Sequence, residues 1–364
     1  MILSEQIKTF AADDIDLFTA FQDYWNHWSA DNLDGRKHSY NDELSLDEKN
    51  TKINNALIET IAKRARYPYD AKNHGSWATD PSVRHHKYGV IGNLLDSVLP
   101  QTMIDHLGLY ADIKFGAFGD SFAFDSEPNT LFVVSKAGGA KRNSEVRRDN
   151  RGQVTIHPVN HMLTANVDLY RVLAGKVSLA DLTIKVIRSM ETEITRETYT
   201  TFETAMDAAD QTATTGLYVA GYTQASLTRL CQQVQAWNQG AKPLIVGTQL
   251  ALANVLPDDA NYRYGEDSDY FKRGYVPTAF GYDTMALPQV ANWQTQFGAN
   301  VISNSRLWII SPSSPKLLKL CFEGETIAII DGPLDNADLT QRTTFSKRWA
   351  SAFCSSSVAG VLTV

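Results

Sequence analysis

The sequence predicts an α+β fold. Helical periodicity runs through the first hundred residues, and a β-type pattern takes over from Phe115 onward. A helical stripe over residues 178–207, without proline or glycine, then stands between two regions of β-type pattern. With 364 residues the chain can form two or three domains, or one elaborate domain.

The N-terminal region predicts two amphipathic helices joined by a polar, turn-rich connection at residues 29–43. The second helix begins after a capping box, Ser45 with Glu48 three positions later. An aromatic and histidine-bearing stretch, residues 67–88, follows it. This alternation fits either an arm lying over a neighbouring subunit or a small helical domain. The apolar faces of the two helices consist of Ile15, Phe18, Phe21, Trp25 and Trp28, and of Ile53, Leu57 and Ile61.

The next region changes from helix to strand. Residues 91–107 read as a helix broken by Pro100. From Phe115 the pattern becomes β-like. We expect strands around Phe122 and Phe124, at 131–134, at 153–158 and towards 167–173.

A basic tract interrupts these predicted strands at residues 135–153. It holds six Lys or Arg, two acids and three glycines, a formal charge of +4 in a chain of net charge −7. The β runs on either side predict an extended hairpin with the tract at its tip. Loops of this length are usually functional or disordered, and a two-stranded ribbon is marginally stable alone, so we expect the hairpin to lie on another subunit. The predicted inter-subunit contact residues are Lys136, Lys141, Arg142, Glu145, Arg147, Arg148, Asp149 and Arg151.

One long helix follows the hairpin. Ser178 can cap its N-terminus, with Asp181 at the third helical position. Thirty residues give a rod of about 45 Å, far longer than the average helix of about 11–12 residues. The pattern is not a strict heptad, which favours a beam across a flat subunit over a coiled coil. Its stripe consists of Leu179, Leu182, Val186, Met190, Ile194, Thr198, Phe202 and Met206.

The C-terminal part reads as α/β and then as β. Ser226 is the predicted cap of a helix that Gly240 ends. A short strand at 243–246 turns through Gly247 and Thr248 into a helix over 249–256. Further strands are predicted at 284–287, 307–310, 317–322, 327–330 and 357–364.

No catalytic or cofactor motif stands out. Lys141 follows two glycines, but Arg142 and then a β run come next, which excludes a phosphate-binding loop opening a helix. His157 and His161 are four apart, yet Pro158 lies between them in a strand-like context. The pair His85 and His86 is expected in a polar loop. We therefore predict a protein that is not an enzyme and has neither cofactor nor metal.

The cysteines, the apolar runs and the net charge limit the expected location and partners of the protein. The three cysteines form no CxxC pair and are expected to be buried thiols. No run of 18 or more apolar residues occurs, and the first residues lack signal-peptide features, so we expect synthesis inside the cell and no membrane partner. The net charge of −7 argues against a chain that binds nucleic acid tightly. It does not argue against a protein shell that encloses nucleic acid.

The order of these elements resembles the major capsid proteins of tailed bacteriophages, the Hong Kong 97 capsid fold. The resemblance covers the chain from about residue 90. Residues 244–252 (LIVGTQLAL) look like that family's strand-to-helix step, and 274–288 (GYVPTAFGYDTMALP) like its glycine-punctuated turn and strand. Residues 308–319 (WIISPSSPKLLK), with Gly324, resemble its late strand pair.

The resemblance implies a set of domains. A spine helix over 178–209 belongs to the peripheral domain. The implied division is an N-terminal arm (1–90), a peripheral domain (91–117, 173–214 and 300–364), an extended β-hairpin arm or E-loop (118–172) and an axial domain (215–299).

The resemblance also implies a function. Subunits assemble through pentamers and hexamers into an icosahedral shell that encloses double-stranded DNA without sequence-specific binding. Portal, scaffolding and decoration proteins are the implied partners, and the chain resides in the virion capsid after assembly in the host cytoplasm. Only about ninety residues precede the shared core, so we expect no removed scaffold segment. Lys136 and Lys141 are expected to make electrostatic contacts and not covalent cross-links.

Three alternatives stay open from the sequence. An encapsulin-like nanocompartment shell has the same fold and encloses an enzyme. A metal-dependent enzyme would use His157 and His161 with nearby acids. A soluble nucleic-acid-binding protein would use the tract at 135–153, although that tract has no aromatic side chain for base stacking.

Overall fold

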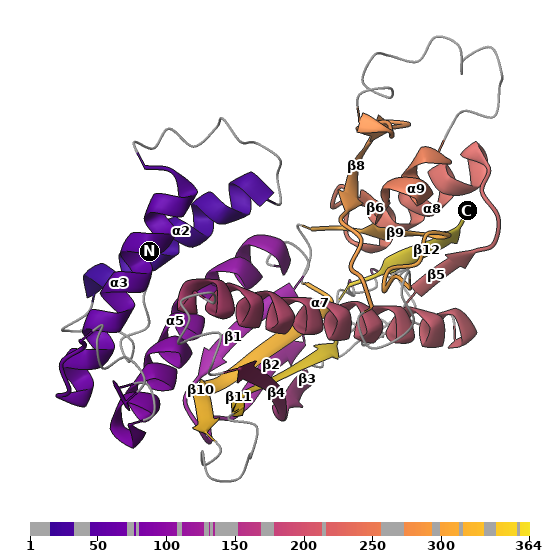
Figure 1. Cartoon of the computed structure of the whole chain (residues 1–364). Coiled ribbons are helices and arrows are strands. Elements are labelled where there is room, and N and C mark those ends of the chain that lie inside the picture. The colour runs from indigo at the N-terminus through magenta and orange to yellow at the C-terminus, as the bar shows by residue number, and fades with distance from the viewer. Residues whose placement is uncertain are drawn as a thin grey trace, which may run out of the picture.

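A computed structural model confirms the α+β fold class. In Figure 1 the long helix α7 (Leu179–Thr212) crosses the molecule, with the N-terminal helices towards one end and a six-stranded sheet towards the other. A four-stranded sheet lies against the same helix. The structure describes residues 15–32, 44–70, 76–77, 80–107, 111–126, 131, 134, 152–168, 178–212, 216–255, 273–292, 299–312, 316–330, 340–354 and 357–364.

The N-terminal helices pack on their own chain. The helices α2 (Ile15–Asn32) and α3 (Leu46–Ala65) have the Ser45–Glu48 capping box between them. Trp28 is partly buried against the main core, and the other predicted apolar residues of known burial lie within it, namely Phe18, Phe21, Trp25, Ile53, Leu57 and Ile61. Asn50 on α3 donates to Asp181 and accepts from Ser178 at the start of α7. The described helices thus form a packed helical unit, and contact with a neighbouring subunit stays a prediction.

The third N-terminal helix, α5 (Pro81–Leu107), is longer than predicted. It contains His85 and His86, which were expected in a loop, and it continues through Pro100. Asp80 caps it by accepting from the backbone N–H of Ser82 at 2.9 Å, and proline suits the first helical turn. Its residues are buried around most of the helix, so the sequence lacks the one-sided stripe of a surface helix.

The helix α7 confirms the predicted spine. The Ser178 hydroxyl accepts from the N–H of Ala180 at 3.2 Å, as a cap should. Thr198 occupies an apolar slot because its hydroxyl donates to the Ile194 carbonyl at 2.8 Å and so needs no other partner. The buried residues of the stripe are Leu179, Val186, Met190, Ile194, Thr198 and Phe202.

The four-stranded sheet contains a strand that the sequence did not reveal. The strand β11 is largely polar, with Phe345, Trp349 and Phe353 as its large apolar residues. The predicted strands at 317–322 and 327–330 are one strand, β10, with an irregularity between Glu323 and Ile327. The helices α5 and α7 cover one face of this sheet. The strand order is β1 (Ala111–Gly116), β10 (Leu318–Ile330), β11 (Thr340–Phe353) and β4 (Val159–Asp168).

The six-stranded sheet carries the helices α8 (Gln224–Trp237) and α9 (Gln249–Ala253). The cap of α8 is Thr223, and Ser226 is its capping-box partner, so the predicted cap at Ser226 was wrong by three residues. The strands β9 and β12, from the segment 300–364 assigned to the peripheral domain, pair inside this sheet. The domain division itself stays a prediction. The order is β5 (Gly216–Val219), β12 (Ala359–Thr363), β9 (Arg306–Ile310), β6 (Leu244–Thr248), β8 (Tyr282–Leu287) and β7 (Thr278–Ala279).

A buried ionic cluster ties α5 to the four-stranded sheet. Asp96 pairs with Lys347 of β11, and the two side chains are only 7% and 6% exposed. Asp96 also accepts from the backbone N–H and the hydroxyl of Thr326, each at 2.7 Å. Lys347 donates further to the Gly324 carbonyl at 3.2 Å. Every member of the cluster is paired, as desolvated charges require.

Replacing Asp96 with asparagine should destabilise the fold strongly. The change leaves Lys347 charged and buried without a counter-charge, which costs about 3–5 kcal/mol in comparable sites. Urea unfolding followed by circular dichroism measures the loss. The matched control is D283N, which removes the carboxylate from the exposed pair Lys242–Asp283, 58% and 55% exposed, and should cost about 1 kcal/mol or less. Equal losses in both variants would contradict the assigned role.

Candidate inter-subunit surface

The predicted hairpin exists, with one correction to its strands. The strand β2 (Phe122–Ser126) pairs antiparallel with β3 (Gly152–Ile156), so the ribbon closes from Phe122 opposite Ile156 to Ser126 opposite Gly152. The sequence had instead placed a flanking strand at 131–134. Leu131 and Val134 lie outside any strand and are 68% and 94% exposed.

The base of this ribbon is seated on the four-stranded sheet. Phe122, Phe124 and Ile156 are buried against Cys321 and Ala350, on the face away from α5 and α7. Burying each aromatic side chain contributes about 1.5–3 kcal/mol. The ribbon is therefore fixed at its base by apolar packing.

Two lysines of the sheet add polar contacts to the seat. Lys114 donates to the Ala123 carbonyl at 2.6 Å and lies 4.4 Å from the centre of the Phe124 ring. Lys319 lies 5.7 Å from the same ring and pairs with Asp112 at 3.2 Å. A cation over an aromatic face is attracted by the ring quadrupole, which orients Phe124.

The turn leading into the ribbon is held by Glu323. Its carboxylate accepts from the N–H of Gly119 at 2.7 Å and pairs with Arg348 at 2.9 Å. Gly119 has φ +87°, a conformation that favours glycine. Gly324, at φ +67°, packs under the Phe118 ring, where any Cβ would collide. The direction in which the hairpin leaves the sheet is thus set by the sheet itself.

The eight predicted contact residues lie outside the described part of the chain. Residues 135–151 contain all of them, from Lys136 to Arg151. The structure therefore shows the base from which the tract departs, and the contact role of its charges stays a prediction.

The histidines proposed for a metal site lie elsewhere in the architecture. His161 on β4 stacks on Trp349 with ring centres 3.9 Å apart, and Trp349 donates to Glu197 of α7 at 2.7 Å. His157 is exposed between β3 and β4. Within the described residues, no group of three or more His, Cys, Asp or Glu side chains is placed to hold a metal ion. The stacking of His161 joins β4 to β11, and the hydrogen bond from Trp349 to Glu197 joins β11 to α7.

The cysteines are buried thiols, as predicted. Burial raises the pKa of Cys231 to about 12 and that of Cys321 to about 11. Both are therefore protonated near neutral pH, and a protonated thiol is a poor nucleophile.

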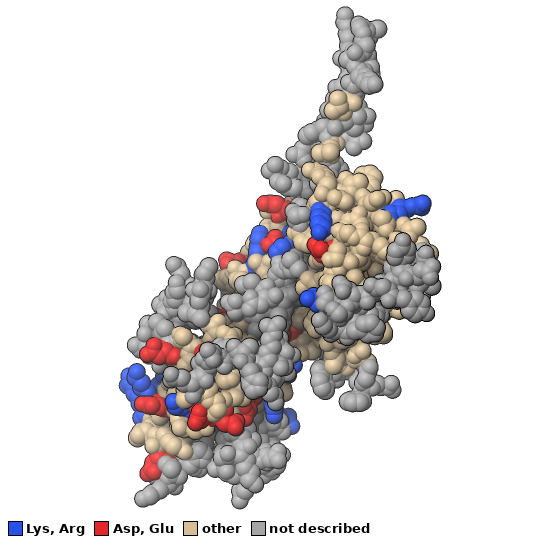
Figure 2. All heavy atoms as spheres, turned by 90° about the horizontal axis from the view of Figure 1, so that it is seen from above, with Lys and Arg blue, Asp and Glu red and all other residues tan. Residues whose placement is uncertain are grey.

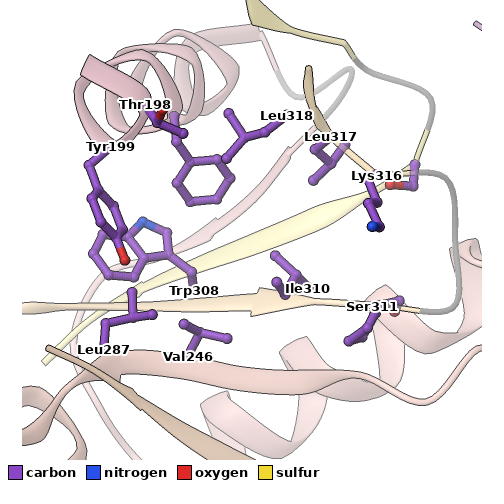
Figure 3. Close-up of a pocket in the computed structure, with 13 residues that line it drawn as sticks. Thr198, Tyr199, Val246, Leu287, Trp308, Ile310, Ser311, Lys316, Leu317 and Leu318 are labelled. Carbon is purple, nitrogen blue, oxygen red and sulfur yellow. The ribbon is translucent and has the colours of Figure 1, made fainter. Parts of the chain in front are cut away.

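An apolar cavity lies where α7 meets both sheets. Figure 3 shows Trp308 and Val246 of the six-stranded sheet facing Leu318 of the other, with Tyr199 of α7 above. Phe202 contacts Trp308 edge to face at 6.0 Å. The cavity volume is about 50 Å³. An engineered cavity that binds benzene measures about 150 Å³, so this one is a packing space at a joint and not a cofactor site.

Charge is dispersed over the described residues of one face of the molecule. On the face in Figure 2, Lys and Arg side chains are scattered among Asp and Glu, and no extended cationic stripe of described residues crosses it. Such a stripe is the usual footprint of nucleic-acid binding. Of the helices in the described ranges, none has the length and apolarity to cross a membrane.

The comparisons place this ribbon-bearing α+β chain among capsid proteins. The family described as "SPbeta prophage-derived putative capsid protein YonB" matches residues 31–363, and the chain belongs to that phage capsid protein family. No curated relative matches the chain. The elements that the resemblance to the Hong Kong 97 capsid fold implied, namely hairpin, long helix and late β-rich region, occur in the expected order.

Several solved capsids are similar to the chain. One is that of cyanophage P-SCSP1u, at 12% identity and TM-score 0.46, over 70% of this chain and 86% of that one. Microbacterium phage Oxtober96 gives 10% identity and TM-score 0.46, over 69% and 88%. The mature capsid of bacteriophage PhiM1 gives 9% and 0.43, over 70% and 85%.

Removing the Phe124 ring should loosen the ribbon. F124A deletes a fully buried side chain and should cost about 3–5 kcal/mol locally. Hydrogen exchange of the amides in β2 and β3 should accelerate, while that of α7 should not change. The matched control is F115A, because Phe115 is a half-exposed residue of β1 in the same sheet and its loss should leave β2 and β3 protected. Unchanged exchange in F124A would contradict the seat.

Proposed function

We propose that this protein is a major capsid protein whose subunits assemble through pentamers and hexamers into an icosahedral shell around double-stranded DNA. The observation that carries the proposal is the match of a capsid protein family over residues 31–363. The proposal makes the protein structural and not enzymatic, and places it in the virion capsid after assembly in the host cytoplasm.

The geometry suits a shell subunit. A stiff helix of 34 residues supports two sheets, and a ribbon with a basic loop leaves the face of one sheet. Head-to-tail contacts between identical subunits form a closed assembly only where the symmetry permits it. A rigid subunit with a hairpin arm is suited to making the same contact repeatedly around such an assembly. The net charge of −7 favours a wall that repels packaged DNA and lets it move.

The proposed domains follow the predicted division with a change suggested by the strand pairing. The strands β9 and β12 belong to the axial domain, together with residues 215–299. The remainder of 300–364 stays with the spine helix in the peripheral domain. Residues 1–90 form the N-terminal arm and 118–172 the hairpin. Portal, scaffolding and decoration proteins complete the proposed set of partners.

Electron microscopy of the expressed protein tests the proposal. We expect closed shells, tubes or rings, alone or with a co-expressed scaffolding protein. Particles that contain DNA support a capsid, whereas particles that contain an enzyme support an encapsulin-like compartment. A protein that stays a monomer under both conditions would refute assembly.

Neutralising three arginines of the hairpin tract should impair assembly. We expect R147Q/R148Q/R151Q to give fewer or less stable shells, because the tract loses three of its six cations. The monomer should unfold at the unchanged temperature, because a contact between subunits does not stabilise an isolated monomer. Sedimentation of assembly reactions measures the shell fraction.

A charge-matched variant separates the tract from net charge. R229Q/R273Q/R342Q removes the same three charges from exposed positions outside the proposed N-terminal arm and the hairpin. It should assemble like the natural protein. Equal assembly by both triple variants would show that the tract makes no essential contact.

A further inference from the structure

A basic cluster lies where the C-terminal end of α3 meets the N-terminal end of α5. The two helices pack against each other at the end of the molecule away from the six-stranded sheet (Figure 1). Trp77 connects the two helix ends. Its indole N–H donates to the Tyr67 carbonyl at 3.1 Å, and its own carbonyl accepts from the N–H of Asp80 at 3.3 Å. Residues 63–70 and 80–87 therefore adjoin.

This cluster is positively charged in an acidic chain. Residues 63–70 and 80–87 hold five Lys or Arg and two acids, a formal charge of +3 in a chain of net charge −7. One of the two acids, Asp80, caps α5 and accepts from a backbone N–H there. Glu59, one helical turn before Lys63, offsets one more positive charge, and an excess of cations is left. The exposed and half-buried basic side chains are Lys63, Arg64, Arg66, His85 and His86.

A buried arginine adds to the positive potential. Arg84 is 6% exposed, and within the described residues its Nε has no hydrogen-bond partner. A desolvated charge that lacks part of its hydrogen bonding favours an anion nearby. Burial, and then the charges of His85 and Arg64, lower the pKa of His86. Because Arg64 belongs to α3 and His86 to α5, cations of the two helices repel one another, and a bound anion would relieve that repulsion.

Two exposed tyrosines follow the basic side chains of α3. Tyr67 and Tyr69 are 38% and 39% exposed. Tyr69 contacts Trp77 edge to face, with ring centres 5.1 Å apart, so its ring is held in place. Cations that pair with phosphates, beside aromatic faces on which bases stack, are the combination by which many proteins bind a nucleic-acid strand. The basic tract at 135–153 has no aromatic side chain and lacks that combination.

We propose that this cluster binds the phosphate backbone of nucleic acid without reading its sequence. Lys63, Arg66 and His85 contact phosphates, and Tyr67 offers a face on which an unpaired base stacks. The cluster reaches few phosphates and the chain as a whole is acidic, so the binding is weak and depends strongly on salt. The inference concerns the single subunit, and it holds whether or not the subunits form a shell.

A salt series with the full-length, unassembled protein tests this binding. Fluorescence anisotropy measures the affinity for labelled oligothymidine and for a DNA duplex of the same length. We expect K63Q/R66Q to bind both more weakly than the natural protein. The slope of log Kd against log salt should fall by about 1.4 for the single strand and about 1.8 for the duplex, because each phosphate contact contributes about 0.7 and about 0.9.

The matched control is R229Q/R342Q, which removes two exposed cations from α8 and β11 and gives the same net charge. It should bind like the natural protein. Equal salt slopes for the two double variants would overturn the proposal, and so would a natural protein that binds neither ligand at low salt. Neither result bears on shell assembly, which electron microscopy measures separately.

The variant Y67A distinguishes the two forms of nucleic acid. We expect its affinity for oligothymidine to fall by about fivefold or more and its affinity for the duplex to stay unchanged, because the bases of a duplex are stacked on one another. Loss on the single strand alone supports a single strand as the ligand. Unchanged affinity for both ligands would contradict the stacking role of Tyr67 and leave the backbone phosphates as the whole of the contact.

Discussion

The buried ion pair between Asp96 and Lys347 is the constraint on which the arrangement depends. Two desolvated charges must lie within contact distance, so α5 can occupy only one position against β11. The irregular stretch of β10 from Glu323 to Thr326 supplies the remaining partners, through the Gly324 carbonyl and the Thr326 N–H and hydroxyl.

The same stretch of β10 also determines the other face of the sheet. Glu323 points away from the helices, where it holds Gly119 and pairs with Arg348. The position of the helices and the exit direction of the ribbon are therefore coupled through a few residues of one strand. In the proposed shell, a force applied to the hairpin is therefore transmitted to the core through these residues of β10.

The proposed contact tract at residues 135–153 is basic, and the ribbon that carries it is seated on aromatic and aliphatic side chains. Charge provides long-range attraction that salt weakens. In the proposed shell, the tract attracts a neighbouring subunit from a distance, while the apolar seat fixes the base of the ribbon.

The sequence by itself determined the features that local chemistry controls. The stripe and cap of α7, the capping box of α3 and the step from strand to helix at Thr248 follow from spacing and capping within a few residues. Only the tertiary structure decided the rest. The strand β11 is hidden in the sequence because Lys347 and Thr343 are polar yet buried, and the partner of β3 is β2 because Phe122 and Phe124 find a seat around Cys321. The position of β11 and the pairing of β2 with β3 depend on contacts between residues about two hundred positions apart in the sequence. A local sequence pattern therefore cannot predict them.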